Sequence, residues 1–425
     1  MIETALDPLA PEVVADPYPF LARQREDQPV AYCPAIDMWL ITRHADIDHV
    51  FTHPDLFSAT NAQAPLTPLC AEAMDILKAG FRILPVMSNA DKPVHPRIRR
   101  RLAQAFSARR VRLLTPIIEE RCRSLIDAFA DRGEADLMPE LCYPLPALTI
   151  FAMIGFPPQD SDRIKAWCAD KLVVNWGRPS QRQQIDAART MVAFWAYCED
   201  FVALRRGQPA DDLTSDLMSG QDDSEPLTDR EIASIIFGLS FAGHETTTNH
   251  AANAIRRIHE NGLWEAIRAD RALIPAAVEE TLRFDSSVTA WRRVARQDCE
   301  IGGVAIPAGA KLMLSLAAAN RDPAKFPNPD RFDIARHRPE DHLSFGKGVH
   351  YCLGVPLARI ESGILLNQLL DRFPDMTLVQ DGEYDFPANI SFRGPLTLPA
   401  RWTPPGRSPA RMITARFPAA PDCPD

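Results

Sequence analysis

Residues 345–354 read F-G-K-G-V-H-Y-C-L-G and place one thiol, Cys352, between a glycine-rich approach and a new helix. Gly346 and Gly348 permit backbone angles that a side chain would forbid, so the loop can turn its amide N–H groups toward the sulfur. Helix-forming sequence begins at Leu353, which puts the thiol at or near a helix N-terminus. Backbone donors and the positive end of the helix dipole both favour a thiolate over a thiol. The stretch therefore predicts a thiolate suited to ligate iron.

The alternative is a structural cysteine buried in a tight turn, because free cysteine is among the most buried residue types. The ten-residue context argues against that alternative. The stretch resembles the haem-binding signature of the cytochrome P-450 family, F-G-x-G-x-H-x-C-x-G, with every fixed position filled. The resemblance implies a haem b (iron protoporphyrin IX) cofactor, with Cys352 as the axial ligand of the iron and Phe345 among the haem-binding residues.

Composition limits the classes of function. The 425 residues are 46% hydrophobic and 24% charged, which is enough apolar material for a large core. A net charge of −9 argues against general nucleic-acid binding. No run approaches the roughly 18 apolar residues that a membrane-spanning helix needs. We therefore expect no nucleic-acid partner and no membrane.

Cysteine usage and the N-terminal sequence indicate the compartment. The nine cysteines are scattered, odd in number and contain no CxxC pair. This pattern argues against a metal cluster or a disulfide framework and fits a reducing environment. The first residues are acidic and Pro-rich, without the basic region and apolar core of a signal peptide. We expect a cytoplasmic protein.

The periodicity along the chain predicts a mainly helical fold with small β-sheets. Strands are expected at 31–33, 38–41, in a hairpin within 300–318, and at 392–402. One helix is expected to begin at about residue 46, and another is expected to end near residue 106. Further helices are expected at 116–131, 145–155, 160–174, 184–205 and 353–373. Residues 52–90 are Pro- and Ala-rich with weak periodicity, and we interpret them as a long mobile loop.

A second candidate site lies in the middle of a long predicted helix. Thr228 and Glu231 form a capping box, and apolar residues follow at helical spacing to about residue 259. The centre, residues 242–248, reads A-G-H-E-T-T-T. Glycine followed by β-branched threonines is poor helix-forming sequence. We expect a kink there that opens space for oxygen and water.

The 242–248 segment resembles the A-G-x-E/D-T motif of the same family. The match implies that Thr246 hydrogen-bonds dioxygen and orders water, that Glu245 relays protons from solvent, and that Ala242 and Gly243 contact the haem. An acid beside an alcohol suits a reaction in which two protons reach oxygen. The alternatives are a surface carboxylate for Glu245 and, for Thr246, a hydroxyl bonded to the preceding turn.

Cationic side chains at several positions suit the carboxylates of a haem. His95 and Arg99 lie four residues apart on one helical face. The resemblance implies that both bind a haem propionate, as do Arg293 and His350, and arginine makes charge-assisted bonds to carboxylates. The other arginines of residues 97–112 predict a basic patch for an acidic redox partner. The alternatives are a solvated helix face and, for Arg293, a surface arginine.

Glu280 and Arg283 face the same side of a helix, three residues apart. Exposed pairs of this kind are common and contribute little to stability. Upstream of Cys352, the pair resembles the family's scaffold pair, whose role is structural. The resemblance implies that it ties the helix to the segment before the cysteine loop, through Arg331 or Arg336.

The sequence does not name the substrate. The candidate contacts are Phe241, Val288, Thr289, Ala290 and Ile390. The segments expected to form the pocket, 52–90, 170–190 and 286–291, are apolar and aromatic with little fixed charge. This composition favours a small hydrophobic or aromatic compound.

The resemblance spans roughly residues 16–402 and implies one haem domain at 1–402, followed by a Pro- and Arg-rich segment at 403–425 that is either a tail or a linker to a fused reductase. The implied function is a monooxygenase that inserts one atom of dioxygen into a small organic substrate. Its electrons would come from a ferredoxin or a flavin reductase, separate or fused, on a basic proximal face, the side of the haem that carries Cys352. Two alternatives remain: a peroxide-driven peroxygenase, against which the Glu245–Thr246 pair argues, and a non-catalytic haem-binding sensor.

Overall fold

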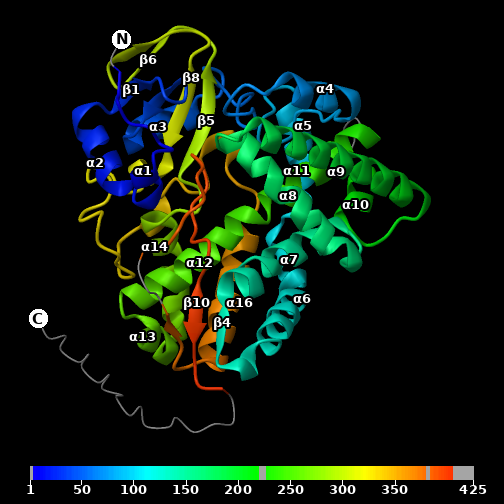
Figure 1. Ribbon diagram of the computed structural model, residues 1–425, viewed down its shortest axis with the longest axis vertical. Coiled ribbons are helices and arrows are strands. Elements are labelled where there is room, and N and C mark those ends of the chain that lie inside the picture. Colours follow the sequence, from blue (N-terminus) through cyan, green and yellow to red (C-terminus); the bar gives the residue numbers. More distant parts are fainter. Residues whose placement is uncertain (1–2, 220–225, 380–382, 405–425) are drawn as a thin grey trace, which may run out of the picture.

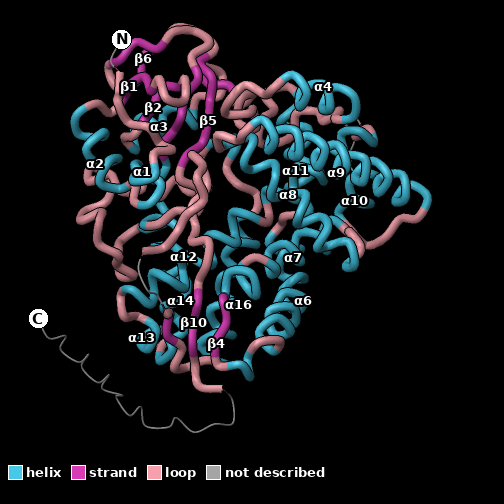
Figure 2. The backbone as a smooth tube through the Cα atoms, in the orientation of Figure 1, coloured by secondary structure: helices cyan, strands magenta, loops and turns pink. Residues whose placement is uncertain are grey.

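The computed structural model describes residues 3–219, 226–379 and 383–404, and helices form most of it (Figures 1 and 2). The α-helices are α1 (Pro11–Ala15), α2 (Tyr18–Asp27), α3 (His44–Thr52), α4 (Ala71–Gly80), α5 (Val94–Ala105), α6 (Ala108–Asp127), α7 (Pro144–Ile154), α8 (Ser161–Trp176), α9 (Gln181–Gly207), α10 (Leu213–Ser219), α11 (Asp229–Ala242), α12 (Glu245–Glu260), α13 (Trp264–Ala269), α14 (Ile274–Phe284), α15 (Leu316–Ala319) and α16 (Val355–Arg372). Short helical turns lie at η1 (Ala130–Arg132), η2 (Met138–Cys142), η3 (Pro158–Asp160), η4 (Arg271–Leu273), η5 (Pro339–Asp341) and η6 (Gly348–His350).

The strands are β1 (Val30–Cys33), β2 (Met38–Ile41), β3 (Phe57–Ser58), β4 (Glu134–Asp136), β5 (Ala290–Ala295), β6 (Cys299–Ile301), β7 (Val304–Ile306), β8 (Lys311–Ser315), β9 (Thr377–Leu378) and β10 (Pro399–Arg401). They gather in two regions, at the upper left and at the bottom of Figure 2. The mainly helical fold with small sheets is confirmed.

The larger sheet has the order β1-β2-β8-β5-β3. Strands β2 and β8 pair in parallel, and the other neighbours are antiparallel. Leu312 of β8 lies opposite Trp39 on one side and Arg293 on the other. Arg293 therefore belongs to an inner strand of this sheet. The second sheet, β4-β10-β9, joins residue 134 to residue 401 at the bottom of Figure 1.

The main hydrophobic core extends from α5 to α16 and surrounds α11 and α12. The capping box at the start of α11 is confirmed, because Thr228 Oγ1 accepts from the Glu231 amide at 3.2 Å and Glu231 Oε2 accepts from the Thr228 amide at 2.8 Å. Ile232, Ile235 and Ile236 then bury the inward face of this helix. The predicted apolar stripe therefore anchors α11 in the core.

The structure corrects two predictions about elements. The single kinked helix from 228 to 259 is two helices, α11 and α12, which meet at Gly243 and His244. The predicted loop at 52–90 contains β3 and the helix α4, which packs on α9. Residues 71–80 are rich in Ala, Leu, Met, Glu and Lys, so local helix propensity was present although the amphipathic pattern is weak.

Among the described residues, no helix combines the length and the apolar character needed to cross a bilayer. The segment 405–425, which holds most of the predicted tail or linker, lies outside the described residues.

Candidate active site

A cavity of about 470 Å³ lies where α8, the α11–α12 junction and the Cys352 loop meet. The Cys352 thiol is exposed to this space. The predicted site residues that line it are Arg99, Phe241, Ala242, Gly243, Thr246, Val288, Arg293, Phe345, His350 and Cys352. The fold therefore brings residues from four separate segments of the chain to one cavity.

The cysteine loop needs glycine at two positions. Gly346 and Gly348 have φ values of 66° and 68°, in the left-handed region that favours glycine. A Cβ at Gly348 would lie 2.5 Å from the carbonyl oxygen of Phe51, so a side chain there would collide with the backbone. The Cys352 amide donates to the Phe345 carbonyl at 3.0 Å, which closes the loop. Helix α16 begins three residues after the thiol.

Opposing influences act on the Cys352 thiol. Burial raises its pKa, whereas the amides of Gly354 and Val355 and the Arg99 guanidinium lower it. In the chain without haem, the net effect is a raised pKa of the thiol. The predicted inward-pointing donors are therefore present, but burial outweighs them. A metal ion bound to a thiol deprotonates it outright. Full thiolate character at Cys352 thus depends on ligation.

Arginine and histidine side chains gather at the cavity. Arg99, Arg293 and His350 line it, and the His95 ring packs on the His350 ring with centroids 4.1 Å apart. Arg99 donates one bond to the Tyr351 carbonyl at 2.8 Å. Its buried Nη1 and the buried Nε2 of His95 have no hydrogen-bond partner within the described chain.

These residues fit a haem. A flat, mainly apolar group with two carboxylates would occupy the cavity and supply acceptors to the unpartnered donors of His95 and Arg99. Burial lowers the pKa of Arg293 only to about 10, so its guanidinium stays charged at neutral pH. The Cys352 thiol faces the same space and supplies a soft ligand for iron.

The α11–α12 junction places the predicted alcohol at the cavity. Gly243 packs so closely on α7 that a Cβ there would lie 2.7 Å from the Ile150 side chain. Thr246, in the first turn of α12, lines the cavity, and its hydroxyl donates to the Ala242 carbonyl at 2.9 Å. This is the bond to the preceding turn that the sequence left as an alternative. The oxygen of the hydroxyl keeps its capacity to accept a bond from the cavity side.

Glu245 does not line the cavity. Its Oε1 accepts a hydrogen bond from Asn249 Nδ2 at 3.0 Å. Burial raises the pKa of the Glu245 carboxyl, and the Asn249 bond opposes that rise. Glu245 is therefore a partly buried acid one residue from Thr246, directed away from the cavity.

Comparison with known proteins identifies the family. Residues 252–386 match the cytochrome P450 family. The chain is 37% identical over 409 residues to the cytochrome P450 monooxygenase PikC of Streptomyces venezuelae, a match that covers 93% of this chain and 94% of the relative. The chain belongs to the cytochrome P450 family. It is a P450 monooxygenase, and membership implies a haem-thiolate cofactor and a need for electrons from a redox partner.

Two solved P450 structures extend the comparison. Cytochrome P450 CREJ, in complex with (4-ethylphenyl) dihydrogen phosphate, is 37% identical with a TM-score of 0.89, over 92% of this chain and 98% of that one. An intact type IV self-sufficient cytochrome P450 monooxygenase is 36% identical with a TM-score of 0.91, over 98% of this chain and 55% of that one. The whole fold of this P450 is therefore that of the family.

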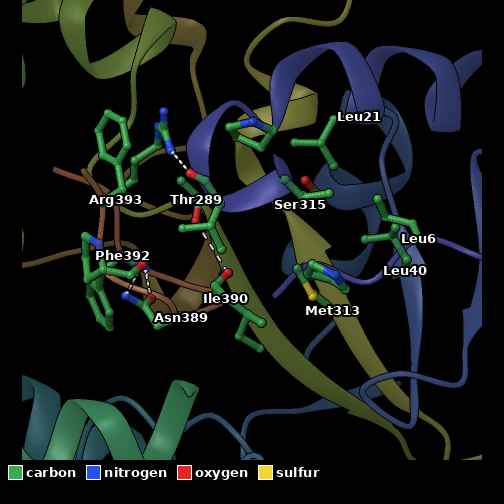
Figure 3. Close-up of a pocket in the computed structure, with 16 residues that line it drawn as sticks. Leu6, Leu21, Leu40, Thr289, Met313, Ser315, Asn389, Ile390, Phe392 and Arg393 are labelled. Carbon is green, nitrogen blue, oxygen red and sulfur yellow. Dashed lines mark hydrogen bonds between the residues drawn. The ribbon is translucent and has the colours of Figure 1, made fainter. Parts of the chain in front are cut away.

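The substrate candidates divide between two cavities of this P450. Phe241 and Val288 line the central one. Thr289 and Ile390 line a separate cavity of about 50 Å³, where the Thr289 hydroxyl donates to the Ile390 carbonyl at 3.4 Å (Figure 3). Ala290 is buried in β5 opposite Ser315. The side-chain alternation along this extended segment directs Val288 and Thr289 to opposite sides.

The Glu280–Arg283 pair of this P450 is fully buried, with both side chains 0% exposed. Arg283 donates two bonds to the Glu280 carboxylate, at 2.7 and 2.8 Å. Arg336 Nε donates to both carboxylate oxygens at 3.1 Å, and Arg283 also donates to the Arg331 carbonyl at 3.2 Å. Of the two arginines that the sequence proposed, one contributes its side chain and the other its backbone.

Three buried titratable residues line the central cavity without having been predicted from the sequence: Lys171 of α8, His250 of α12 and Glu361 of α16. Lys171 and Glu361 lie among buried apolar residues of their helices, whereas the buried part of α12 around His250 also carries Thr247, Asn249 and Asn253. A charged residue on a buried face is a readable signal. Which face is buried, however, depended on packing that no motif reports.

Proposed function

We propose that this P450 binds haem b through Cys352 and oxidises a small, mainly apolar organic substrate in the central cavity. One observation carries the proposal: the Cys352 thiol and the Thr246 hydroxyl, from segments far apart in sequence, line the same cavity. A bound haem supplies the redox chemistry that activates dioxygen, and a thiolate ligand favours O–O cleavage. The chain supplies the ligand, the protons and the shape of the cavity.

Arg99, Arg293, His350 and His95 would hold the haem carboxylates. The unpartnered Arg99 Nη1 and His95 Nε2 support this role, because buried polar groups without partners are costly. The His350 ring is oriented by a bond between its Nδ1 and the Met87 carbonyl at 3.0 Å. In the chain without haem, burial and the neighbouring Arg293 and His95 lower the pKa of His350 to about 3.

Thr246 and Glu245 would manage protons. Thr246 presents a hydroxyl to the cavity from a fixed position, because the Ala242 carbonyl holds its proton. That oxygen can orient a water molecule beside the substrate. Burial raises the pKa of Glu245, which suits an acid that holds a proton more readily than an exposed carboxyl does.

The substrate is proposed to be small and hydrophobic or aromatic. The cavity is lined mainly by apolar and aromatic side chains, among them Phe81, Ile83, Leu239, Phe241 and Trp291. The P450 relative solved with (4-ethylphenyl) dihydrogen phosphate, a small aromatic compound, supports the same size and class.

The coupling of electron use to product tests the role of Thr246. We expect Thr246→Ala to keep consuming electrons while product per electron falls about tenfold or more, because removal of one positioned proton-transfer group typically costs 10²–10⁴-fold. Thr248→Ala is the matched control, since Thr248 lies on the same helix, is buried and does not line the cavity. Unchanged coupling in Thr246→Ala would remove Thr246 from the proposed mechanism.

The redox partner is proposed to dock near the exposed side of the cysteine loop. The basic patch is smaller than the arginine count implies, because Arg97 pairs with Glu231 and Arg110 pairs with Asp211 and Asp216. Arg100 is exposed. Val349 and Tyr351 of the cysteine loop, to which Arg99 bonds, are also exposed. An acidic ferredoxin or flavin domain would meet an apolar surface at this loop and the cationic Arg100 of α5.

We also propose that residues 1–402 form the haem domain and 403–425 a linker. The match of 98% of this chain to little more than half of an intact self-sufficient P450 supports the linker over the tail. A reducing cytoplasm is proposed as the compartment, since the eight cysteines within the described ranges are all free.

A further inference from the structure

A lysine lies inside the central cavity of this P450. Lys171, on α8, is 6% exposed and is among the residues that line the cavity. Its Nζ lies 4.1 Å from the ring centroid of Phe241 and 5.1 Å from that of Phe237, both on α11. The side chain therefore extends from α8 toward α11.

The Lys171 ammonium has no anionic partner. In the part of the chain that the structure describes, no carboxylate lies within 4.0 Å of Nζ and no acceptor forms a hydrogen bond with it. Two aromatic faces attract a desolvated cation. They leave the three N–H donors of the ammonium unfilled. A buried lysine is ordinarily paired, so this one lacks a counter-charge that a ligand can supply.

The Lys171 side chain remains charged when the cavity is free of ligand. Burial lowers its pKa to about 8, and the neighbouring Cys168 acts in the opposite direction. A group with that pKa is mainly protonated at pH 7. The cavity thus contains a fixed positive charge in an otherwise apolar part of its wall.

The surroundings of Lys171 restrict the ligand further. Most of the side chains that line the cavity are apolar, including Phe81, Met191 and Ile235. Asn175, one turn later on α8, is 2% exposed and its Nδ2 donates to Gln63 Oε1 at 3.4 Å, so this amide is already engaged. A fitting ligand has one anionic group and an apolar body.

We propose that Lys171 is a specificity-determining residue that binds an oxyanion, a carboxylate or a phosphate, at one end of an otherwise apolar substrate. The inference rests on the proposed function and deepens it. Lys171 contacts α11 before the Gly243 break, whereas Thr246 follows the break. The anionic end would bind on the α8 side of the cavity, and the apolar body would extend into the rest of the cavity, which Thr246 also lines.

Three ligands that share one apolar body separate charge from shape: 4-butylbenzoate, 4-butylphenylphosphonate and the neutral 4-butylbenzamide. Each is titrated into the haem-loaded protein and binding is followed by the haem Soret band. We expect at least one of the two anions to bind about tenfold or more tightly than the amide, because hydrogen bonds to charged groups are about twice as strong as neutral ones. The tighter anion identifies whether carboxylate or phosphate is the matching group.

Lys171→Met tests the residue itself. This variant is expected to lose the preference for the anion and to bind the amide as the parent does, with an unfolding temperature at least as high, since an unpaired buried charge is replaced by an apolar side chain. Lys165→Met is the matched control. Lys165 is on the same helix, pairs with Asp162 at 2.7 Å and does not line the cavity, so the preference should survive.

Equal affinity for anions and amide in the parent, or an unchanged preference in Lys171→Met, would overturn the inference. Either result with an intact haem-thiolate spectrum would leave the proposed function standing. Loss of that spectrum in the parent protein would instead contradict the proposed function itself.

Discussion

Burial acts on Lys171, His250 and Glu361, three ionisable side chains of the central cavity, in the direction that removes their charge. It lowers the pKa of Lys171 to about 8 and that of His250 to about 4, and it raises the pKa of Glu361 to about 8. Such shifts follow from the cost of a charge in a medium of low polarity. His250 and Glu361 are therefore mainly neutral at pH 7, and Lys171 is the member of this group that keeps its charge.

Glu361→Gln is expected to make stability less dependent on pH. The folded state holds a proton on Glu361 up to about pH 8, whereas the unfolded carboxyl releases it near 4.5. The folded state therefore binds more protons between these values, and its stability falls as pH rises. Glutamine mimics the protonated carboxyl, so the variant should gain on the parent by about 1 kcal/mol or more between pH 6 and pH 9.

Urea unfolding of both proteins at pH 6 and pH 9 measures this effect. Glu199→Gln, at an exposed position of α9, is the control and should not change with pH relative to the parent. A parent-to-variant difference in unfolding free energy that is the same at both pH values would show that Glu361 is ionised in the fold.

At the residue scale, the site could be predicted where its chemistry lies in a short motif. Cys352 and Thr246 were found because glycines and β-branched residues around them have local consequences. Lys171 and Glu361 were missed because their role depends on which face of α8 and α16 meets the cavity. The composition of the pocket segments also suggested little fixed charge, and the buried Lys171 alters that expectation.

At the scale of elements, the junction of α11 and α12 is set by one close contact. Gly243 leaves room for the Ile150 side chain of α7, and a Cβ would approach it to 2.7 Å. The weak helix propensity of the segment was readable in the sequence. The complete break between the two helices could not be read from it, because the residue in close contact, Ile150, lies about ninety positions earlier in the chain.

Gly243→Ala is therefore expected to lower the free energy of unfolding by about 1–3 kcal/mol, the usual cost of overpacking. Gly363→Ala is the control. Gly363 lies within α16, and a Cβ at this position would have no neighbouring atom within 4 Å, so alanine there should stabilise by up to about 1 kcal/mol. Thermal or urea unfolding compares them. Shifts of the same sign at both positions would mean that the Ile150 contact does not shape the junction.

At the scale of the whole molecule, Asp285 joins distant parts of the chain. Its carboxylate, 0% exposed, accepts from Tyr18 Oη at 2.6 Å and from Arg257 Nε at 2.9 Å, and it pairs with Arg256. Arg393 approaches it to 3.6 Å and also donates to the Val14 and Ala15 carbonyls. The N-terminal helices, α12, the end of α14 and the C-terminal segment thus meet at one buried charge.

Asp285→Asn is expected to destabilise the fold by about 3–5 kcal/mol, because it leaves buried arginines without their counter-charge. Burial opposes ionisation of Asp285, but Arg257, Arg256 and Arg393 outweigh it and hold the pKa of the carboxyl well below its usual 3.8. Stability from this group is thus present above about pH 4 and is lost as pH falls below it. The difference in unfolding free energy between the parent protein and Asp285→Asn should therefore become smaller at acid pH.

Unfolding by urea at pH 7 and at pH 3 checks both expectations. Asp371→Asn is the control, since its bond to Arg271 lies at the surface with the aspartate 75% exposed, and it should cost less than about 1 kcal/mol. An Asp285→Asn variant as stable as this control would show that the buried cluster does not hold the fold together.

The overall architecture could be predicted because four motifs occur in one order along the chain and each fixes a local structure. The connections between distant parts could not. The β4–β10 pairing and the Asp285 cluster join segments more than 250 residues apart, and neither leaves a periodic signal. The prediction of a loop at 52–90 was wrong for the same reason, since the helix α4 is stabilised by packing on α9.

The central claim is that Cys352 ligates a haem iron as a thiolate. The absorbance of the dithionite-reduced protein with carbon monoxide tests it most directly. We predict a Soret band near about 450 nm, the wavelength in the name of the family, and loss of that band in Cys352→Ala. A band well short of that wavelength in the parent protein, under conditions that keep it folded, would contradict thiolate ligation and leave Cys352 as a structural residue of its loop.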